Sequence, residues 1–278
     1  MTEIVQDTAF ALPPLNRLLA SRLMHETRIT QLLQGYRDIP PADRASLEEI
    51  ILRLSQLVVD FPQVAELDLN PVIVTDGRPT AADARVRLKS SALESPDHLV
   101  ISPYPAQYES EAVTDDGLAL FVRPIRPEDA PLFEDLFDTL SKTSIYNRFF
   151  SPVKSLTRRM LVRYTQIDYD RQIALVALKG DTRNTMLGVA RVIRTAGGGG
   201  AEFSVLVGDP WQDRGIGAVL LKRCLQVAQD QGIRRVWGTV LPQNNRMLAL
   251  ARKLGFDVCR PGHDEVEVRI DLQAVDLS

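Results

Sequence analysis

Two glycines, Gly215 and Gly217, stand where an apolar stretch typical of a strand gives way to one typical of a helix. The segment around them reads DPWQDRGIGAVLL and runs from Asp209 to Leu221. A helix N-terminus exposes backbone N–H groups without partners, together with the positive end of the helix dipole. Glycine also removes the Cβ atoms that would keep a ligand away from the backbone. The segment therefore indicates an anion site of the kind that binds phosphate groups.

Two familiar phosphate-binding loops do not fit this segment. No G-K-[ST] follows the glycines, which excludes a Walker A motif. Leu220 stands where the Rossmann fingerprint would place a third glycine, and the preceding strand is expected to follow a hairpin rather than to open a βαβ unit. The glycines alone therefore leave the ligand open.

A carboxylate precedes the loop in the stretch AEFSVLV, whose alternation predicts a strand. Glu202 lies five residues before Val207 and is expected to share a strand face with Ser204 and Leu206. Acyl transfer to an amine needs a neutral nucleophile, and a lysine ammonium has a pKa of about 10.4. A nearby carboxylate can remove that proton as a general base, directly or through water. The alternative is a strand glutamate that only faces solvent.

The elements that must position these residues form an α/β unit, which we place at residues 118–275. Their expected order, β-α-α-β-β-β-α-β-α-β, mixes hairpins with crossovers and predicts a mixed β-sheet flanked by helices. The helix after the glycines is expected to end at Gly232. Its apolar face, which predicts packing against the sheet, consists of Leu220, Leu221, Cys224, Leu225 and Ala228.

The region before this unit has a different pattern. Ser46 and Glu49 form an S-x-x-E capping box that predicts the start of a helix, and Asp76-Gly77 predicts the turn of a hairpin. We therefore expect a small α/β region at residues 1–88. Residues 89–117 are rich in Ser, Pro and Asp and are expected to form a linker.

The segment QDRGIG fits the pattern Q/R-x-x-G-x-G/A, and Asn244 and Gly255-Phe256 follow it. Together these motifs resemble the GNAT family of acyl-CoA-dependent N-acetyltransferases, over roughly residues 118–272. The resemblance implies that acetyl-CoA is the co-substrate and that Asn244 hydrogen-bonds its pantetheine arm. The strand of Val205, Leu206 and Val207 would pair with that arm as an added strand does. The backbone N–H groups that would hold the pyrophosphate belong to Gln212, Asp213, Arg214, Gly215, Ile216 and Gly217.

Within that family, the pattern AEF-x-V-x-V followed by D-x-W-Q-x-R-G-x-G is similar to the Pat-type protein lysine acetyltransferases. This resemblance implies that Glu202 is the general base and that the amide of Leu206 or of Val207 holds the oxyanion. The segment SIYNRFF resembles an S-x-x-Y-x-R-F segment of the same group, on the side where the acceptor enters. A structural ion pair is the alternative role for its Arg148.

One position departs from the family pattern. Many GNAT members carry a tyrosine seven residues after the motif asparagine, as general acid for the departing thiolate. Ala251 stands at that position here. Either the thiolate leaves unprotonated or another donor serves, and Tyr146 and Tyr164 are candidates by residue type.

The stretches ELDLNPVIV and AADARVRL resemble the C-terminal lobe of the ATP-grasp domain of ADP-forming acyl-CoA synthetases. Asn70 and Asp83 stand where that family places magnesium ligands, and their oxygens suit a hard cation. The lobe that supplies the lysines and the phosphate loop would precede Met1. We therefore expect a structural or regulatory remnant, with no working metal site.

The composition excludes several classes of protein. The formal net charge of −3 gives no electrostatic reason to expect nucleic acid or an acidic membrane as a partner. No apolar run approaches the roughly 18 residues that span a bilayer, and the N-terminus lacks the pattern of a signal peptide. Cys224 and Cys259 lie far apart, which argues against a disulfide framework or a zinc site.

We therefore expect a cytoplasmic N-acetyltransferase that acetylates a lysine of a protein partner, for which the family suggests an acyl-CoA synthetase. Two alternatives stay open: a GNAT enzyme that acetylates a small amine, and a module that binds acetyl-CoA as a sensor without catalysis. The sequence leaves open the acceptor, the acyl-chain preference and the oligomeric state.

Overall fold

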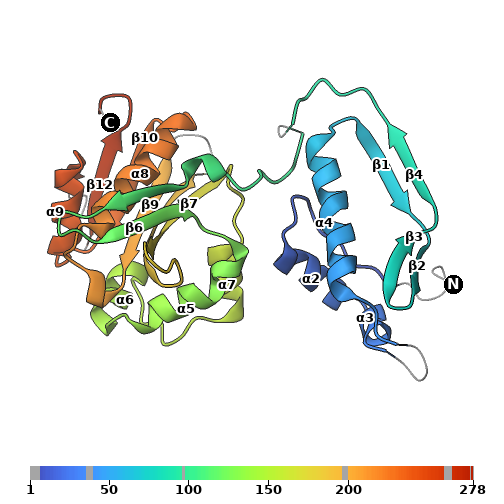
Figure 1. Cartoon of the computed structure of the whole chain (residues 1–278). Helices are drawn as coiled ribbons and strands as arrows, with labels where there is room; N and C mark the ends of the chain where they lie inside the picture. Colours follow the sequence, from blue (N-terminus) through green and yellow to red (C-terminus); the bar gives the residue numbers. More distant parts are fainter. Residues whose placement is uncertain are drawn as a thin grey trace. The chain divides into compact units, whose positions relative to one another are not determined.

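The computed structural model describes residues 7–35, 40–95, 98–195, 200–259, 265–275 and 277. The chain divides into two compact units, Met1–Pro103 and Tyr104–Ser278. Figure 1 shows both, with the N-terminal unit in blue to teal and the C-terminal unit in green to red. Within the described residues, no helix is both long and apolar enough to span a bilayer.

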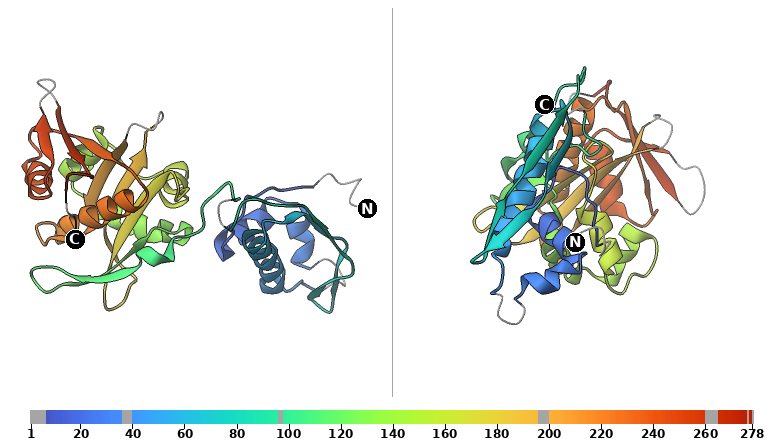
Figure 2. Two further views of the ribbon diagram at one scale, coloured as in Figure 1. Left: turned by 90° about the horizontal axis from the view of Figure 1, so that it is seen from above. Right: turned by 90° about the vertical axis from the view of Figure 1, so that its right-hand side faces the viewer.

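The N-terminal unit pairs helices with short antiparallel strands. The strands form two sheets of two strands each, β1 with β4 and β2 with β3. The hairpin predicted at Asp76-Gly77 joins β2 to β3, and both turn residues have the positive φ that such a turn requires, 50° and 78°. Figure 2 shows the helices on one side of the strands. The elements are α2 (Arg17–His25), α3 (Ile29–Leu33), α4 (Arg44–Asp60), β1 (Val64–Leu69), β2 (Val72–Thr75), β3 (Arg78–Ala81) and β4 (Ala84–Leu88).

Helix α4 begins earlier than the capping-box pattern predicts. Asp43 is the N-cap, and its carboxylate accepts hydrogen bonds from the backbone N–H groups of Ala45 at 3.1 Å and Ser46 at 3.3 Å. The expected cap, Ser46, instead lies in the first turn and donates its hydroxyl to Asp43 at 2.6 Å. The prediction of Ser46 as N-cap was wrong because the helix begins three residues earlier, where the carboxylate of Asp43 accepts the first unpaired amides.

Most of the buried apolar core lies in the C-terminal unit. The N-terminal unit buries Ala20, Met24 and Val59 among its described residues. Its sheets leave large apolar side chains in solvent, including Ile73 at 49% and Leu88 at 67% exposure. A unit with so little buried apolar surface has a small hydrophobic driving force for folding.

The C-terminal unit is built on an eight-stranded mixed sheet in the order β11-β12-β10-β9-β8-β7-β6-β5. This confirms the mixed sheet flanked by helices that the sequence predicts. The first strand, β5, falls inside residues 89–117, so the sheet begins within the segment expected to be a linker. The strands are β5 (Ser110–Val113), β6 (Ala119–Pro124), β7 (Gln172–Lys179), β8 (Met186–Arg194), β9 (Ala201–Val207), β10 (Arg235–Val240), β11 (Asp257–Cys259) and β12 (Val266–Asp271).

Helices cover both faces of this sheet (Figures 1 and 2). The apolar face predicted for α8 is fully buried in the larger core cluster, which also contains Leu248 and Ala251 of α9. A second cluster packs α5 against the opposite face. The segment SIYNRFF lies in helix α6, which the sequence pattern did not predict. The helices are α5 (Ala130–Asp138), α6 (Lys142–Phe149), α7 (Arg158–Thr165), α8 (Ile216–Asp230) and α9 (Asn245–Lys253).

The sheet opens between β9 and β10. These two parallel strands pair only at Ala201 with Val236 and at Glu202 with Trp237 within the described residues. On its other side, β9 stays paired with β8 along its whole length, from Ala201 to Val207. The rest of β9 therefore has one edge that no neighbouring strand occupies in the part of the chain the structure describes.

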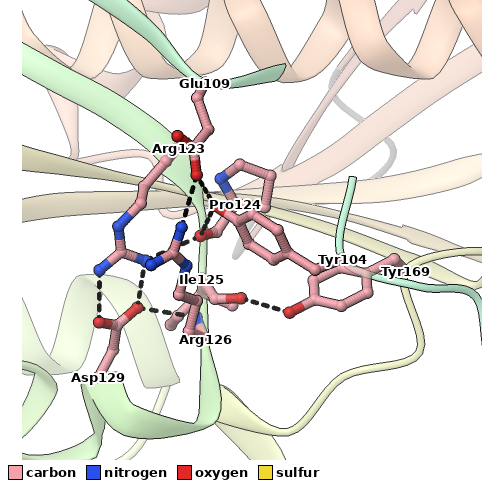
Figure 3. Close-up of polar contacts among 8 residues, drawn as sticks. All are labelled: Tyr104, Glu109, Arg123, Pro124, Ile125, Arg126, Asp129 and Tyr169. Carbon is pink, nitrogen blue, oxygen red and sulfur yellow. Dashed lines mark hydrogen bonds and ion pairs between the residues drawn. The ribbon is translucent and has the colours of Figure 1, made fainter. Parts of the chain in front are cut away.

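A polar cluster built around a buried ion pair fixes the start of the C-terminal unit (Figure 3). The guanidinium of Arg123 makes two hydrogen bonds to the carboxylate of Asp129, at 2.6 and 2.7 Å, and both side chains are less than 10% exposed. Next to them, Glu109 accepts hydrogen bonds from Tyr104 and Arg126, both at 2.6 Å. Because Tyr104 also stacks edge-on against Tyr169, the chain is held to the sheet from its first residue in this unit.

Candidate functional site

A cavity of about 580 Å³ lies where β9 and β10 separate. Its wall brings together the free part of β9, the loop that follows it, the start of α8, and parts of α6 and α9. Ten of the eleven residues expected to act as the base or to bind the cofactor line it: Glu202, Val205, Leu206, Val207, Gln212, Asp213, Gly215, Ile216, Gly217 and Asn244. The eleventh, Arg214, does not.

The loop before α8 offers a row of free backbone donors. Within the described residues, the N–H groups from Asp213 to Ala218 have no hydrogen-bond acceptor. They include the first turn of α8, where no intrahelical acceptor exists. The amide of Gln212 differs from this row because it lies 3.4 Å from the carbonyl oxygen of Asp209, within a turn. The donors expected to hold an anion are therefore present, but shifted by one residue along the chain.

The two glycines serve different purposes. Gly215 caps α8 in the left-handed region, with a φ of 82°, which disfavours any residue with a Cβ. At Gly217, a Cβ would meet side chains of Val205, Val207 and Leu250 only at ordinary contact distances of 3.5 to 3.7 Å. The fold therefore does not require glycine at position 217, in agreement with the motif Q/R-x-x-G-x-G/A, which accepts alanine there.

The side chain of Gln212 is a structural link rather than a free ligand group. Its amide nitrogen donates to the carbonyl of Val207 at 3.1 Å, to Asp209 at 2.9 Å and to the hydroxyl of Ser144 at 3.2 Å. Its carbonyl oxygen accepts a hydrogen bond from Arg246. The sequence pattern did not reveal these contacts, because Ser144 lies 68 residues away along the chain.

Arg214 and Asp213 point to neighbours outside the row of amides. The guanidinium of Arg214 pairs with Asp116 at 2.5 Å, and a hydrogen bond from Thr114, followed by the one from Arg214, lowers the pKa of that carboxyl. The carboxylate of Asp213 pairs with Arg246 at 2.8 Å. Both side chains thus hold the loop in place, while the backbone between them stays free.

Glu202 lies at the fork of the sheet, the point where β9 and β10 separate, and it is exposed to solvent while lining the cavity. It shares this face of β9 with Ser204, which is half-buried and also lines the cavity. On the opposite face, Phe203 packs tightly into the larger core. The strand alternation predicted from the sequence is therefore present, and it directs the carboxylate toward the open side of the sheet.

The backbone N–H groups of β9 point alternately toward its two edges. Gly208 donates its N–H to the carbonyl of Leu187 on β8 at 3.0 Å. Because hydrogen-bonded residues alternate along an antiparallel pair, the amide of Leu206 also faces β8, and the amides of Val205 and Val207 face the open edge. Of the two strand amides considered for the oxyanion, only that of Val207 is thus directed toward the cavity.

Asn244 caps helix α9, and its side-chain oxygen accepts a hydrogen bond from the N–H of Met247 at 3.1 Å. Its side-chain nitrogen has no acceptor within the described residues and remains available in the cavity wall. Ala251 is fully buried in the core and does not line the cavity. The described residues of the cavity wall include no tyrosine, so neither Tyr146 nor Tyr164 lines the cavity.

Two arginines give the region beside Glu202 a surplus of positive charge. Arg148 lines the cavity from α6, and within the described residues no carboxylate lies at ion-pair distance from it. Burial lowers the pKa of Arg148, opposed by the nearby Tyr164 and Glu202. On β8, Arg191 is only 2% exposed and donates to the carbonyl of Tyr164 at 2.5 Å. Burial and then the charge of Arg148 lower the pKa of Arg191 to about 9.

The two residues that match magnesium ligands lie in the N-terminal unit. Asp83 is half-exposed, and its carboxylate pairs with Arg85 at 3.3 Å. Asn70 lies in the connection between β1 and β2. Within the described residues, no group of three or more His, Cys, Asp or Glu side chains gathers in a way that could hold a metal ion.

Comparison with known proteins assigns the two parts of the chain to two families. The profile of the ATP-grasp domain matches residues 1–88, and that of the acetyltransferase (GNAT) family matches residues 140–256. Acetyltransferase PA5475 of Pseudomonas aeruginosa is 30% identical over 157 residues, which cover 55% of this chain and 83% of that protein. The crystal structure of the GNAT domain of S. lividans PAT is 32% identical, with a TM-score of 0.57, and covers 61% of this chain and 99% of that one.

The N-terminal region matches part of a much longer ligase. The ADP-forming acetate–CoA ligase I of Archaeoglobus fulgidus is 35% identical over 86 residues, which cover 31% of this chain but only 13% of the ligase. The cavity and the row of free amides agree with these similarities. The chain belongs to the GNAT family of acetyltransferases, and a fragment similar to the ATP-grasp domain of ADP-forming acyl-CoA ligases precedes its acetyltransferase domain.

Proposed function

We propose that this acetyltransferase moves the acetyl group of acetyl-CoA to a lysine amine of a protein, with Glu202 as the general base. The observation that carries the proposal is the fork between β9 and β10. One cavity joins the free N–H groups at the start of α8 to a carboxylate on the preceding strand. An anionic cofactor group suits the amides, and an amine substrate suits the carboxylate.

In this proposal the coenzyme A pyrophosphate is held by the amides from Asp213 to Ala218. The pantetheine arm lies along the free edge of β9 and takes hydrogen bonds from Val205 and Val207 as an added strand would. The side-chain nitrogen of Asn244 donates to the same arm. These assignments place the thioester near Glu202, because an extended arm follows β9 away from the loop.

The reaction then needs no acyl-enzyme. Glu202 takes a proton from the lysine ammonium, directly or through water, and the neutral nitrogen attacks the thioester carbonyl. The attack forms a tetrahedral intermediate, and a backbone N–H on the free edge of β9 near Glu202 donates to its oxyanion. The nitrogen of the intermediate loses its second proton to water, and collapse then breaks the carbon–sulfur bond and releases the coenzyme A thiolate. Because the described cavity wall contains no tyrosine, the thiolate leaves unprotonated, as the modest pKa of a thiol permits.

The positive charge beside Glu202 would affect the protonation state of an amine acceptor. A lysine ammonium is disfavoured near Arg148 and Arg191, so the neutral form that reacts is favoured there. A protein acceptor is supported by the similarity to Pat-type acetyltransferases, and the ATP-grasp fragment makes an acyl-CoA synthetase the acceptor we would test first. We place the catalytic domain in the C-terminal unit, whose sheet begins with β5 ahead of the expected boundary at residue 118, and assign no catalytic role to Asn70 or Asp83.

The test is mass spectrometry of a cell lysate incubated with the protein and isotope-labelled acetyl-CoA, beside a parallel reaction with Glu202→Gln. We expect labelled acetyl-lysine on one or a few proteins with the wild type and background labelling with the variant. Because chemical acetylation by acetyl-CoA occurs without enzyme, a third sample without protein sets that background.

Each other outcome contradicts a different part of the proposal. Label found only on small amines would show that the acceptor is not a protein. Equal labelling by wild type and Glu202→Gln, with acetyl-CoA binding intact by calorimetry, would remove Glu202 from the chemistry.

A further inference from the structure

The carboxylate of Asp209 joins the loop before α8 to the first turn of helix α6. One of its oxygens accepts the backbone N–H of Ser141 at 3.0 Å, and the other accepts the hydroxyl of Ser144 at 2.6 Å. Ser141 is the N-cap of α6, and its own hydroxyl accepts the N–H of Ser144 at 3.2 Å. A residue at the end of β9 thus satisfies donors at the start of a helix more than 60 residues earlier in the chain.

Gln212, in the loop before α8, adds two hydrogen bonds to this cluster. Gln212 donates to both Asp209 and Ser144, at 2.9 and 3.2 Å. Gly208 lies so close to α5 that a Cβ there would be 2.6 Å from the hydroxyl of Thr139. Burial raises the pKa of Asp209, but the hydrogen bonds from Ser144 and Ser141 outweigh it and lower that pKa. The carboxylate is therefore ionised at neutral pH, the form that accepts these bonds best.

Helix α6 depends on this end for its position. None of its residues from Lys142 to Phe149 is fully buried, and its packing against the core is concentrated at its other end, where the ring of Phe149 contacts the rings of Phe137 and Tyr164. The same helix supplies Thr143, Asn147 and Arg148 to the cavity wall that also contains Glu202. A small displacement of the loop would therefore move the wall on the side of the proposed acceptor.

We propose that Asp209 is a positioning residue that couples occupancy of the loop to helix α6, so that coenzyme A binding orders the acceptor side of the cavity. This inference rests on the proposed function, because it takes coenzyme A as the ligand of the loop. Such coupling is reciprocal: an acceptor that needs α6 in place binds more tightly once the loop is occupied, and the reverse holds by the same factor.

Hydrogen exchange of the full chain with and without coenzyme A tests this directly, followed by mass spectrometry of the peptides. In the wild type, coenzyme A should slow exchange both in the loop at 209–218 and in α6 at 142–149. In Ser144→Ala and in Asp209→Asn, the loop should remain protected by coenzyme A, while the added protection of α6 should fall at least severalfold. Ser151→Ala is the matched control, because Ser151 follows α6 and bonds only to the carbonyl of Phe149 within the described residues.

The outcomes separate this inference from the function it rests on. Protection of the loop without any added protection of α6 in the wild type would overturn the coupling and leave the proposed function intact. Unchanged α6 protection in both variants would show that Asp209 does not carry the coupling. Absence of protection in the loop itself would overturn coenzyme A binding, and the inference with it.

Discussion

Glu202 of β9 lies directly opposite Trp237 of β10, and this is the last pair that joins the two strands in the described part of the chain. Beyond it, β9 continues beside β8 alone, and the cavity opens. The carboxylate therefore lies at the closed end of the fork. This position is held from both sides by backbone pairing, which suits a group that must meet a reacting amine with little reorganisation.

Replacement of Glu202 by Gln keeps the size of the side chain and removes its basicity. We expect kcat to fall about 10²- to 10⁴-fold, the usual contribution of a general base. The dissociation constant of coenzyme A should stay within about twofold, because the loop amides are untouched. Steady-state kinetics and calorimetry measure the two quantities. Glu267→Gln, on β12, is the control and should retain full activity; an equal loss in both variants would exclude a specific role for Glu202.

Gly217→Ala separates ligand approach from folding. The added methyl has room against Val205, Val207 and Leu250, and alanine favours a helix over glycine by up to about 1 kcal/mol, so stability should be equal or higher. Affinity for coenzyme A should stay within about threefold, because the motif Q/R-x-x-G-x-G/A accepts alanine at this position, and threefold is less than about 1 kcal/mol. Urea unfolding and calorimetry check both. A loss of affinity of tenfold or more would mean that the ligand approaches this backbone more closely than an added methyl allows.

Gly215→Ala should behave in the opposite way. Its φ of 82° places an alanine in the left-handed region, which costs about 1 to 2 kcal/mol. We therefore expect a lower free energy of unfolding in the urea experiment, whether or not coenzyme A affinity changes. Equal stability of Gly215→Ala and the wild type would show that the turn relaxes around the new side chain.

Elements with strong local periodicity could be predicted from the sequence. The buried face of α8, from Leu220 to Ala228, follows a 3.6-residue repeat, and AEFSVLV alternates as a strand with one buried face does. Helix α6 could not be predicted in the same way, since none of its residues is fully buried and it lacks an apolar stripe. Strand β5 has four residues and pairs at the edge, so its local signal resembles that of a loop.

The same distinction between local and long-range signals applies to the residues of the site. The glycine loop, Glu202 and Asn244 are close in sequence to the elements that place them, so motif spacing identified them, and all of them except Arg214 line the cavity. The role of Gln212 as a link could not be read from its motif, because it depends on Ser144 and Arg246, which are distant along the chain. The burial of the charged side chain of Arg191 could not be predicted either, since an arginine within a strand is usually exposed.

Asp129→Asn should strongly destabilise the C-terminal unit. It leaves the guanidinium of Arg123 buried with a neutral partner in place of a carboxylate at 2.6 Å (Figure 3). Breaking a buried ion pair from one side typically costs about 3 to 5 kcal/mol. Trp211 and Trp237 are the only tryptophans of the chain and both lie in this unit, so their fluorescence during urea unfolding reports on it.

The matched control for that variant is Glu111→Gln, which breaks the exposed pair between Glu111 and Arg183. Exposed pairs contribute about 0 to 1 kcal/mol, so this variant should unfold close to the wild type. A similar small loss in both variants would mean that water reaches Arg123 when its partner is neutral.

Glu109 should make the stability of the same unit depend on pH. Its hydrogen bond from Tyr104, aided by the charge of Arg126 and opposed by burial, holds its pKa below the ordinary value of 4.5. A carboxyl with a lowered pKa in the folded state stabilises the protein above the unfolded pKa, and this contribution is lost as the pH falls through the folded value.

Glu109→Gln should therefore lower the urea midpoint at pH 7 and at pH 6 by the same amount. Below about pH 4.5 the difference from the wild type should shrink, because the wild-type carboxyl then takes up its proton. Tyr104→Phe removes the donor and should weaken the same pH dependence. A difference between Glu109→Gln and the wild type that stays constant down to pH 3 would show that the charge of Glu109 contributes nothing to folding.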